Sequence, residues 1–250
     1  MSNSVVLVTG ALTGIGRATA LAFAAEGARV AVSGRHPDKG EALVAELMAT
    51  GAADALFVKA DVRNEDEVSA LVDAVVGKFG RLDIAVNNAG KDTIAAIADI
   101  TPESFDEAFG TNVLGTLLSL KHEFRAMKGQ GKGAIVNVGS VYGHKGFGGG
   151  GSIYAGTKAA IEEITRCAAL EGAPLGIRVN AVAPGHVETP MFNRVIGDNQ
   201  DVKTAVAGMI PLGRVGEPRE IGDAIIFMTS DKASFLTGEI ITIDGGLAAT

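Results

Sequence analysis

Short β-branched runs alternate with longer helical stretches along the chain, and this alternation constrains the fold more than any other feature of the sequence. Residues 5–9 form one such apolar run, and a helical pattern follows over 15–26 until Gly27 ends it. Apolar strands joined by helices indicate a parallel sheet that helices cover on both faces. We therefore predict an α/β fold with a doubly wound parallel sheet of about seven strands. The strands are expected at 5–9, 29–33, 55–59, 82–87, 133–138, 177–182 and 239–243, and the helices at 15–26, 37–48, 65–79, 102–127 and 154–170.

Length and composition fit one domain of this kind. Of the 250 residues, 47% are hydrophobic and 20% are charged, which leaves enough apolar side chains to bury a sheet on both faces. We therefore expect a single domain over residues 1–250. Residues 186–211 include Pro, Gly and Met but have weak periodicity, so we interpret this segment as a lid over a binding site.

Charge and cysteine content argue against several classes of protein. The net charge is −7 and no run of Lys or Arg could neutralise a phosphate backbone, so nucleic acid is not an expected partner. Cys167 is the only cysteine, which excludes an internal disulfide and a cysteine cluster for a metal. No apolar stretch reaches membrane-spanning length, and the run at 5–8 lacks the basic flank of a secretion signal. We expect a cytoplasmic protein with no membrane partner and no metal.

Three glycines separate the first expected strand from the first expected helix. Gly10, Gly14 and Gly16 have the spacing G-x-x-x-G-x-G, and the helix follows directly. Free backbone N–H groups and the helix dipole at such a position favour a pyrophosphate. An isolated glycine triplet is weak evidence, because turns need glycine for positive φ. Its place between strand and helix predicts a dinucleotide site.

Tyr154 and Lys158 lie four residues apart in an expected helix, so their side chains share one face. A phenol with a pKa of about 10 is a poor base at neutral pH, and a nearby ammonium group lowers this pKa by favouring the phenolate. Such a pair is common on exposed helices and is weak evidence alone. Ser140, at the end of the expected 133–138 strand, supports the interpretation of the pair as catalytic.

The chain resembles the short-chain dehydrogenase/reductase family, in the form with a TGxxxGxG cofactor turn and a YxxxK active site. The resemblance covers the whole chain, and its motifs occur in order at 9–16, 61–62, 87–90, Asn112, Ser140 with 154–158, and 184–185 with Thr189. It implies a single-domain Rossmann fold and a nicotinamide-dependent oxidoreductase.

By this resemblance, the dinucleotide lies along the carboxyl ends of the strands. Asp61 would hydrogen-bond the adenine amino group, Asn87 would lie near the adenosine ribose, and Thr189 would help to fix the nicotinamide carboxamide. The implied cofactor-binding residues are Gly10, Thr13, Gly14, Ile15, Gly16, Ser33, Arg35, Asp61, Val62, Asn88, Ala89, Gly90, Tyr154, Lys158, Pro184, Gly185, Val187 and Thr189.

In this family the residue after the second strand selects the dinucleotide, since a carboxylate binds the free ribose and an arginine binds the added phosphate. Here Gly34 stands in the place of the acid, between Ser33 and Arg35. The Arg35 guanidinium can hold the phosphate, so the sequence favours NADP(H). NAD(H) remains the alternative, with Arg35 as an ordinary solvated side chain, because some NAD-using relatives also lack the acid.

The resemblance also assigns catalytic roles. Tyr154 would exchange the proton with the substrate oxygen, Ser140 would hydrogen-bond that oxygen, and Lys158 would bind the nicotinamide ribose. Asn112 matches an asparagine whose helix distortion supports a water chain from the lysine. Ser140 lies fourteen residues before Tyr154, where relatives usually have thirteen, and we place the extra residue in the glycine-rich loop at 146–151. Ser152 is the alternative to Ser140.

Loops at the carboxyl ends of the strands are the expected place of substrate contacts. The expected contacts are Tyr142, His144, His186 and Met191, with Phe192 and the polar pair Lys91 and Asp92 beside them.

The expected activity is that of a carbonyl reductase or alcohol dehydrogenase for a small secondary alcohol or ketone, in the homotetramer that is usual for the family. One alternative is a 3-oxoacyl-[acyl-carrier-protein] reductase, for which Arg125, Lys128 and Lys132 would bind the acidic carrier, although the overall acidity opposes it. Another is an NAD-dependent polyol, sugar or cyclic alcohol dehydrogenase. A lyase or an inactive nucleotide sensor would be expected to lose the glycine turn, Tyr154 or Lys158.

Overall fold

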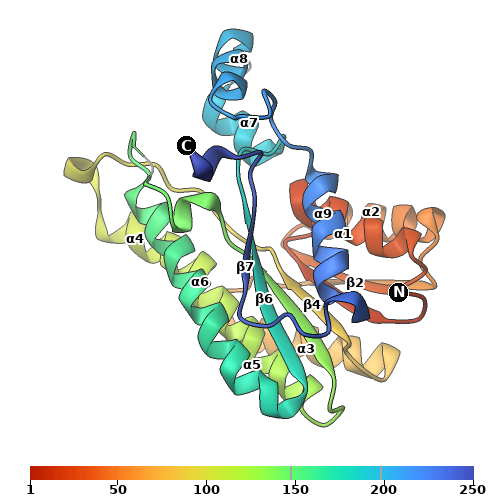
Figure 1. Cartoon of the computed structure of the whole chain (residues 1–250). Helices are drawn as coiled ribbons and strands as arrows, with labels where there is room; N and C mark the ends of the chain where they lie inside the picture. The colour runs from red at the N-terminus through yellow and green to blue at the C-terminus, as the bar shows by residue number, and fades with distance from the viewer. Residues whose placement is uncertain (147, 198) are drawn as a thin grey trace.

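The computed structural model describes residues 1–146, 148–197 and 199–250, and these contain one seven-stranded sheet (Figure 1). The strand order is β3-β2-β1-β4-β5-β6-β7, and every neighbouring pair is parallel. The strands are β1 Val5–Thr9, β2 Arg29–Gly34, β3 Asp54–Lys59, β4 Ile84–Asn87, β5 Gly133–Val138, β6 Ile177–Pro184 and β7 Ile240–Ile243. The predicted α/β class and doubly wound parallel sheet are confirmed.

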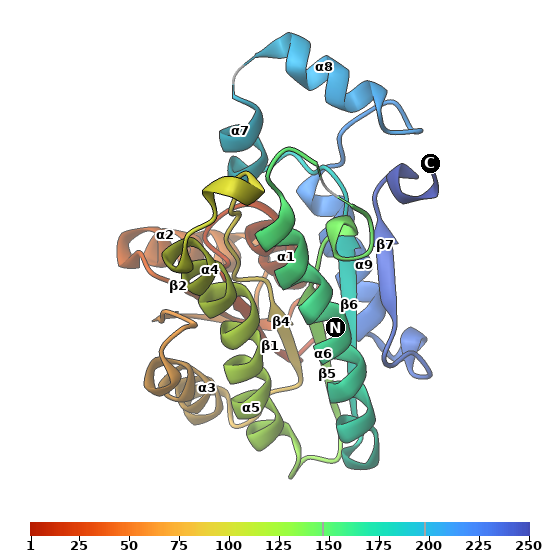
Figure 2. The ribbon, with the colours of Figure 1, turned by 90° about the vertical axis from the view of Figure 1, so that its left-hand side faces the viewer.

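Helices cover both faces of the sheet (Figure 1, Figure 2). On β1, Val6 and Val8 pack with α1, whereas Val5 and Leu7 pack with α3, because successive strand residues point to opposite faces. The first face carries α1 Gly14–Ala25, α2 Pro37–Thr50 and α9 Pro218–Thr229, and the second carries α3 Glu65–Phe79, α5 Gly115–Met127 and α6 Ser152–Gly172.

The order of the strands reverses between β1 and β4. The chain leaves β1 toward β2 and β3, and then returns to the other side of β1 to form β4. In open α/β sheets, ligands bind outside the carboxyl ends of the strands at such a point. The topology therefore places a candidate site above β1 and β4.

Two helical regions differ from the prediction. The helix expected at 102–127 is divided into α4 Pro102–Phe109 and α5 by a π-helical turn at Gly110–Leu114. α9 was not predicted, although Glu217 and Glu220 form a capping box at its start and Ile221 and Ile225 are buried in the α1 layer. Short 3-10 helices occur at Ile97–Asp99, Val141–Gly143, Ala173–Leu175, Asp231–Ala233 and Leu247–Ala249.

The 186–211 segment contains two helices rather than an irregular loop. These are α7 Pro190–Ile196 and α8 Gln200–Gly208, which project beyond the carboxyl ends of the strands (Figure 1, Figure 2). Residue 198 of this segment and residue 147 of the predicted loop at 146–151 lie outside the described residues. No helix within the described ranges is long and apolar enough to cross a bilayer.

Candidate active site

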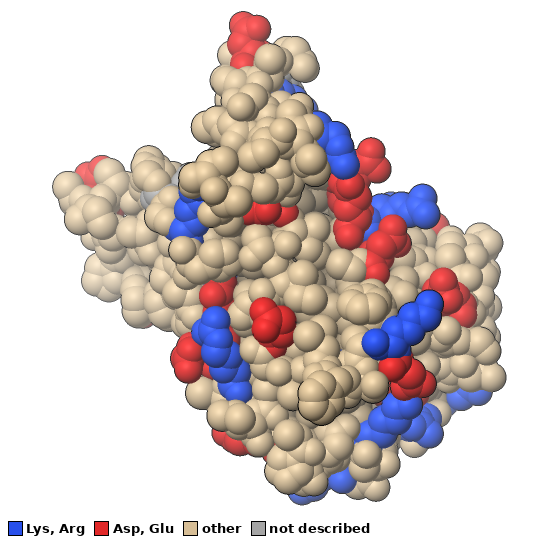
Figure 3. Space-filling view, in the orientation of Figure 1, with Lys and Arg blue, Asp and Glu red and all other residues tan. Residues whose placement is uncertain are grey.

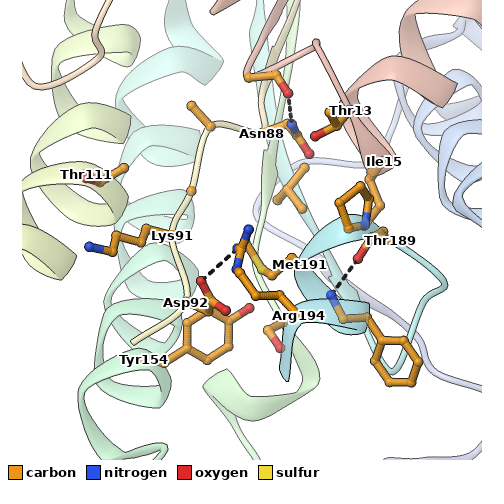
Figure 4. A pocket seen from close by; sticks show the side chains of 18 of the residues that line it. Thr13, Ile15, Asn88, Lys91, Asp92, Thr111, Tyr154, Thr189, Met191 and Arg194 are labelled. Atoms are coloured by element: carbon orange, nitrogen blue, oxygen red, sulfur yellow. Dashed lines mark hydrogen bonds and ion pairs between the residues drawn. The ribbon is translucent and has the colours of Figure 1, made fainter. Parts of the chain in front are cut away.

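A cleft of about 770 Å³ opens at the carboxyl ends of the strands, above β1 and β4 (Figure 4). Its walls are the glycine turn after β1, the loops after β4, β5 and β6, and the first turns of α6. The predicted site residues that line it are Gly10, Thr13, Gly14, Ile15, Arg35, Asp61, Val62, Asn88, Ala89, Gly90, Ser140, Tyr142, Tyr154, Lys158, Pro184, Gly185, His186, Val187, Thr189 and Met191. Gly16, Ser33, Asn112 and His144 lie outside this lining.

The glycine turn packs closely against the end of β4. A Cβ on Gly10, which has φ of +63°, would stand 2.6 Å from the Cα of Ala89, and a Cβ on Gly16 would stand 2.4 Å from the Nδ2 of Asn88. The Asn88 side-chain amide donates hydrogen bonds to the carbonyl oxygens of Thr9 at 3.2 Å and Gly10 at 2.9 Å. Side chains at positions 10 and 16 would therefore separate the turn from β4.

The amino end of α1 faces the cleft. Thr13 is its N-cap residue and makes no side-chain hydrogen bond there, and no acidic residue occupies the first turn. Backbone N–H groups at this end remain available, and the helix dipole favours a negative charge beside them. Thr13, Gly14 and Ile15 also line the cleft. This cradle fits the pyrophosphate of a dinucleotide.

Basic side chains surround the end of the cleft next to β2. Leu12 fills the space beside Gly34, where a Cβ would stand 2.6 Å from the leucine Cδ1. Arg35 is exposed at the cleft edge and forms no ion pair with any residue that the structure describes. Arg63, which was not predicted, pairs with Asp61 at 2.6 Å, and this hydrogen bond lowers the pKa of the Asp61 carboxyl. The end of the cleft thus has one unpaired guanidinium and one paired guanidinium.

Asn87 and Ser33 point into the protein interior. Asn87 is buried, and its side-chain amide donates to Glu123 and to Asn137, both at 3.0 Å. Ser33 is also buried, and its hydroxyl has no hydrogen-bond partner among the described residues. The expectation that Asn87 lies near the adenosine ribose is wrong, because neighbouring residues at a strand end face opposite ways and Asn88 lines the cleft instead.

Ser140, Tyr154 and Lys158 line the same cleft. The Ser140 hydroxyl caps the 3-10 helix that follows β5, and Tyr154 and Lys158 lie in the first two turns of α6. The Lys158 Nζ lies 5.6 Å from the centroid of the Tyr154 ring and donates a hydrogen bond to the Val138 carbonyl oxygen at 2.8 Å. Ser152, the alternative to Ser140, is exposed and lies outside the cleft lining.

Burial opposes the ionisation of both the tyrosine and the lysine. Burial raises the pKa of Tyr154 to about 12. The negative charge of Asp92 raises this pKa further, whereas a hydrogen bond with Ser140 lowers it. Desolvation of the phenol is the largest of these effects, and Lys158 does not contribute the predicted lowering of the Tyr154 pKa. Burial lowers the pKa of Lys158 to about 8. At neutral pH the phenol therefore keeps its proton.

Asn112 lies in the π-helical turn, behind the cleft. It is fully buried, and its side-chain amide donates to the Lys91 carbonyl oxygen and to the Thr157 hydroxyl, both at 2.9 Å. Its side-chain oxygen accepts from the Lys91 N–H at 2.8 Å. The helix distortion that the resemblance implied is present at this asparagine. Asn112 thereby connects α6 with the segment that follows β4.

Of the four predicted substrate contacts, Tyr142, His186 and Met191 line the cleft and His144 does not. The Tyr142 hydroxyl lies 3.0 Å from the Nε2 of His186, and burial lowers the pKa of His186, so this histidine is neutral near pH 7. His144 lies outside the lining and pairs with Glu162 of α6 at 2.7 Å. The structure therefore does not place His144 among the substrate contacts.

Thr189 lies between the glycine turn and α7. A Cβ on Gly14 would stand 3.2 Å from the Thr189 Cγ2, so the two segments are in contact. The Thr189 hydroxyl oxygen caps α7 by accepting from the Phe192 N–H at 3.1 Å, which leaves the hydroxyl hydrogen available to a ligand (Figure 4).

Two ion pairs at the mouth of the cleft were not predicted. Arg194 of α7 donates to Asp92 at 3.1 Å (Figure 4), and Lys91 pairs with Glu107 of α4. Arg194 and Asp92 are 102 residues apart in the chain, and no local pattern in the sequence indicates a contact over such a separation.

The basic residues considered for a carrier protein lie away from the cleft. Arg125, Lys128 and Lys132 lie between the last turn of α5 and the start of β5, near the amino ends of the strands, whereas the cleft opens at their carboxyl ends. Arg125 pairs with an aspartate of α3, and Lys132 pairs with Asp231. On the face shown in Figure 3, basic and acidic side chains are interspersed. Over the described part of the chain, no group of three His, Cys, Asp or Glu side chains could hold a metal ion.

Comparisons with known proteins give full-length matches. The matching family model is described as enoyl-(acyl carrier protein) reductase and covers residues 10–248. A cis-4-hydroxycyclohexanecarboxylate dehydrogenase of Sinomonas cyclohexanicum is 40% identical over 99% of this chain and 98% of its own. A 2,5-dichloro-2,5-cyclohexadiene-1,4-diol dehydrogenase of Sphingobium indicum is 40% identical over 100% of this chain and 98% of its own. The crystal structure of levodione reductase has a TM-score of 0.94 and 35% identity, covering 100% of this chain and 99% of the other.

Proposed function

Since the chain belongs to the short-chain dehydrogenase/reductase family and is an NAD(P)-dependent oxidoreductase that acts on CH–OH groups, we propose that it interconverts a cyclic secondary alcohol and its ketone with NADP(H). The observation that carries this proposal is that Ser140, Tyr154 and Lys158 line the same cleft as the glycine turn. Carbonyl reduction requires a proton donor next to a bound dinucleotide.

Tyr154 is the proposed proton donor in ketone reduction. Its raised pKa keeps the phenol protonated at neutral pH, and the Ser140 hydroxyl would hold the carbonyl oxygen that receives the proton. The dinucleotide, when bound, supplies the hydride that the carbonyl carbon receives. Hydride at carbon and a proton at oxygen convert the ketone into the alcohol, and the reverse transfers convert the alcohol into the ketone.

Lys158 and Asn112 are proposed to prepare Tyr154. The Lys158 ammonium group lies 5.6 Å from the centroid of the Tyr154 ring and would hold the nicotinamide ribose beside it. Both side chains approach Gly90, where a Cβ would stand 3.7 Å from the lysine Nζ and 3.5 Å from the asparagine Oδ1. This arrangement supports a path for protons from the lysine along Asn112.

Arg35 supports NADP(H) as the preferred dinucleotide. Its guanidinium is exposed at the end of the cleft where the adenosine would lie, and no carboxylate occupies position 34 to repel a phosphate. Lys39 and Arg63 line the same part of the cleft and add positive charge there. Asp61 lines the same part of the cleft and would hydrogen-bond the adenine amino group.

The relatives and the cleft walls support a cyclic substrate. The names of the two similar dehydrogenases describe a hydroxycyclohexane carboxylate and a cyclohexadiene diol. In this chain Ile94, Met191 and Phe192 line the cleft and offer apolar surface for ring carbons. We propose that residues 186–211, with α7 and α8, act as the lid over this ring.

The carrier-protein alternative has less support. The description of the matching family model names an acyl carrier protein, but for an enoyl rather than a 3-oxoacyl substrate. In addition, Arg125, Lys128 and Lys132 lie near the amino ends of the strands, away from the cleft at the carboxyl ends, so they do not surround the entrance to Tyr154. A small cyclic ketone is therefore the substrate class that we propose.

A ketone panel tests this function. The purified protein is mixed with NADPH and, in turn, cyclohexanone, cyclopentanone, 2-hexanone and acetoacetyl-coenzyme A, and NADPH absorbance is followed. We expect kcat/KM for a cyclic ketone to exceed that for 2-hexanone by roughly tenfold or more, since the open chain loses more conformational freedom on binding. Turnover of the thioester alone would contradict the proposal and favour the carrier-protein alternative.

A further inference from the structure

Asp92 places a carboxylate in the substrate part of the cleft. Its side chain is 21% exposed and lines the cleft, and its negative charge is close enough to raise the pKa of Tyr154. Figure 4 shows the Asp92 carboxylate beside the Tyr154 ring. A substrate whose oxygen contacts the Tyr154 hydroxyl would therefore have Asp92 as a neighbour.

The backbone on both sides of Asp92 is tied to other elements. The Asn112 side chain binds both the N–H and the carbonyl oxygen of Lys91. Three residues after Asp92, the Ala95 N–H donates to the Gly150 carbonyl oxygen at 2.9 Å. These bonds fix the backbone that carries Asp92 before a substrate binds, which lowers the cost of using its side chain for recognition.

Arg194 occupies only one of the two carboxylate oxygens. Its Nη2 donates to Oδ1 at 3.1 Å, and within the described residues no hydrogen bond reaches Oδ2. The guanidinium is 63% exposed and comes from the proposed lid, so it neutralises the carboxylate from the outer side. Oδ2 therefore retains its capacity to accept a hydrogen bond.

Acid–base chemistry does not explain a carboxylate at this position. The negative charge of Asp92 opposes the phenolate of Tyr154, which alcohol oxidation requires. A partly buried carboxylate also costs free energy unless its oxygens are bonded. A donor on the substrate would remove that cost, and a hydroxyl group is the simplest such donor on a cyclic alcohol.

We propose that Asp92 is a specificity-determining residue that accepts a hydrogen bond from a second hydroxyl group on the substrate. The preferred substrates are then cyclic diols and cyclic hydroxyketones rather than cyclic monoalcohols. This inference depends on the proposed function and adds to it the recognition of a hydroxyl group that does not react.

The test measures alcohol oxidation with NADP⁺ on cyclohexanol, cyclohexane-1,2-diol and cyclohexane-1,4-diol. The variants are Asp92→Ala, which removes the acceptor, and Asp92→Asn, which keeps an acceptor oxygen without the charge. Asp73→Ala is the matched control, because Asp73 also pairs with an arginine, at 2.6 Å, but lies outside the cleft lining. Fluorescence titration with NADPH verifies that each variant binds the dinucleotide and is folded.

The quantity to compare is the ratio of kcat/KM for the better diol to kcat/KM for cyclohexanol. We expect this ratio to be well above one in the wild type, to fall at least tenfold in Asp92→Ala, to fall less in Asp92→Asn, and to stay the same in Asp73→Ala. A wild-type enzyme that oxidises cyclohexanol without preferring either diol, or an Asp92→Ala variant with an unchanged ratio, would overturn the inference and leave the proposed function standing. Failure of the wild type to oxidise any of the three alcohols would instead contradict the proposed function.

Discussion

We propose that the choice between NADP(H) and NAD(H) depends on Arg35 more than on any other side chain of the cleft. It is exposed and has no carboxylate partner among the described residues, so its charge is available to a phosphate. We expect Arg35→Ala to weaken NADPH binding by roughly 10- to 100-fold and NADH binding by less than about threefold. Fluorescence titration of both dinucleotides measures the two dissociation constants. Equal weakening of NADPH and NADH would refute the preference for the phosphorylated form.

Glu123 is a titratable residue outside the cleft whose environment is unusual. It is fully buried in α5, one carboxylate oxygen accepts from the Asn87 amide at 3.0 Å, and the other has no partner among the described residues. Burial raises its pKa to about 7 from the ordinary value of 4.5. Between these two values the folded protein holds a proton that the unfolded chain has lost, so folding stability falls as pH rises through this window.

Glu123→Gln should remove this pH dependence, because glutamine keeps an acceptor for the Asn87 amide and does not ionise. We expect the variant to be more stable than the wild type at pH 8 by about 1 to 3 kcal/mol and nearly equal to it at pH 5. Urea unfolding at the two pH values measures the difference, and Glu163→Gln, exposed on the same face of the sheet in α6, controls for the change of residue type. A difference between the proteins that is the same at both pH values would contradict the raised pKa.

Local spacing predicts some of the site residues, and spatial contacts decide the others. Gly10 and Gly16 could be identified because a strand, a tight turn and a helix follow one another directly, and Tyr154 and Lys158 because they share a helix face. The contact of Arg194 with Asp92 depends on where α7 lies, which no periodicity specifies. Asn87 and His144 were misplaced because the direction of a side chain at a strand end or in a loop depends on packing.

The π-helical turn at Gly110–Leu114 is the element that connects the helical layer to the cleft. Asn112→Ala would remove three side-chain hydrogen bonds, to Lys91 and Thr157. We expect a loss of about 2 kcal/mol in the free energy of unfolding. We also expect kcat for ketone reduction to fall at least tenfold, because the segment after β4 and the path from Lys158 both lose a fixed partner.

Asn64→Ala is the matched control for this element. The Asn64 side chain caps α3 by accepting from the Asp66 and Glu67 N–H groups, and its loss should cost about 1 kcal/mol without a change in kcat. Urea unfolding and initial rates separate the two effects. If Asn112→Ala were to lose stability but keep its kcat, Asn112 would be a structural residue only.

The periodicity of the sequence is most informative where an element packs along its whole length. All seven strands and α3 occur at or near their predicted positions, because continuous apolar runs pair in the sheet and Gly80 ends α3 in a left-handed conformation. α7 and α8 were not predicted, since they are short and only Phe192 and Val206 are buried in them. Short helices on the outside of a fold carry too few buried residues for a clear period.

Across the whole molecule, we propose that apolar side chains on α4, the π-helical turn and α5 form a contact between copies of the chain. Phe105, Leu114 and Leu117 are each 45% exposed there. We propose a homotetramer and expect light scattering to give about four times the chain mass of 25.4 kDa. Leu117→Asp should reduce that mass by placing a charge in an apolar contact, whereas Lys128→Asp, at the end of the same helix, should not. A wild-type protein that is monomeric at micromolar concentration would contradict the proposal.

The central proposal is that Tyr154 passes the proton in a reaction between NADPH and a cyclic ketone. The most direct measurement is the initial rate of NADPH oxidation with cyclohexanone for the wild type and for Tyr154→Phe, with the NADPH dissociation constant determined for each. We predict a fall in kcat of roughly 100- to 10,000-fold with the dissociation constant changed by less than about threefold, because only the hydroxyl group that carries the proton is removed and the ring stays in place. Tyr154→Phe turnover at a rate close to that of the wild type would contradict the proposed role of Tyr154.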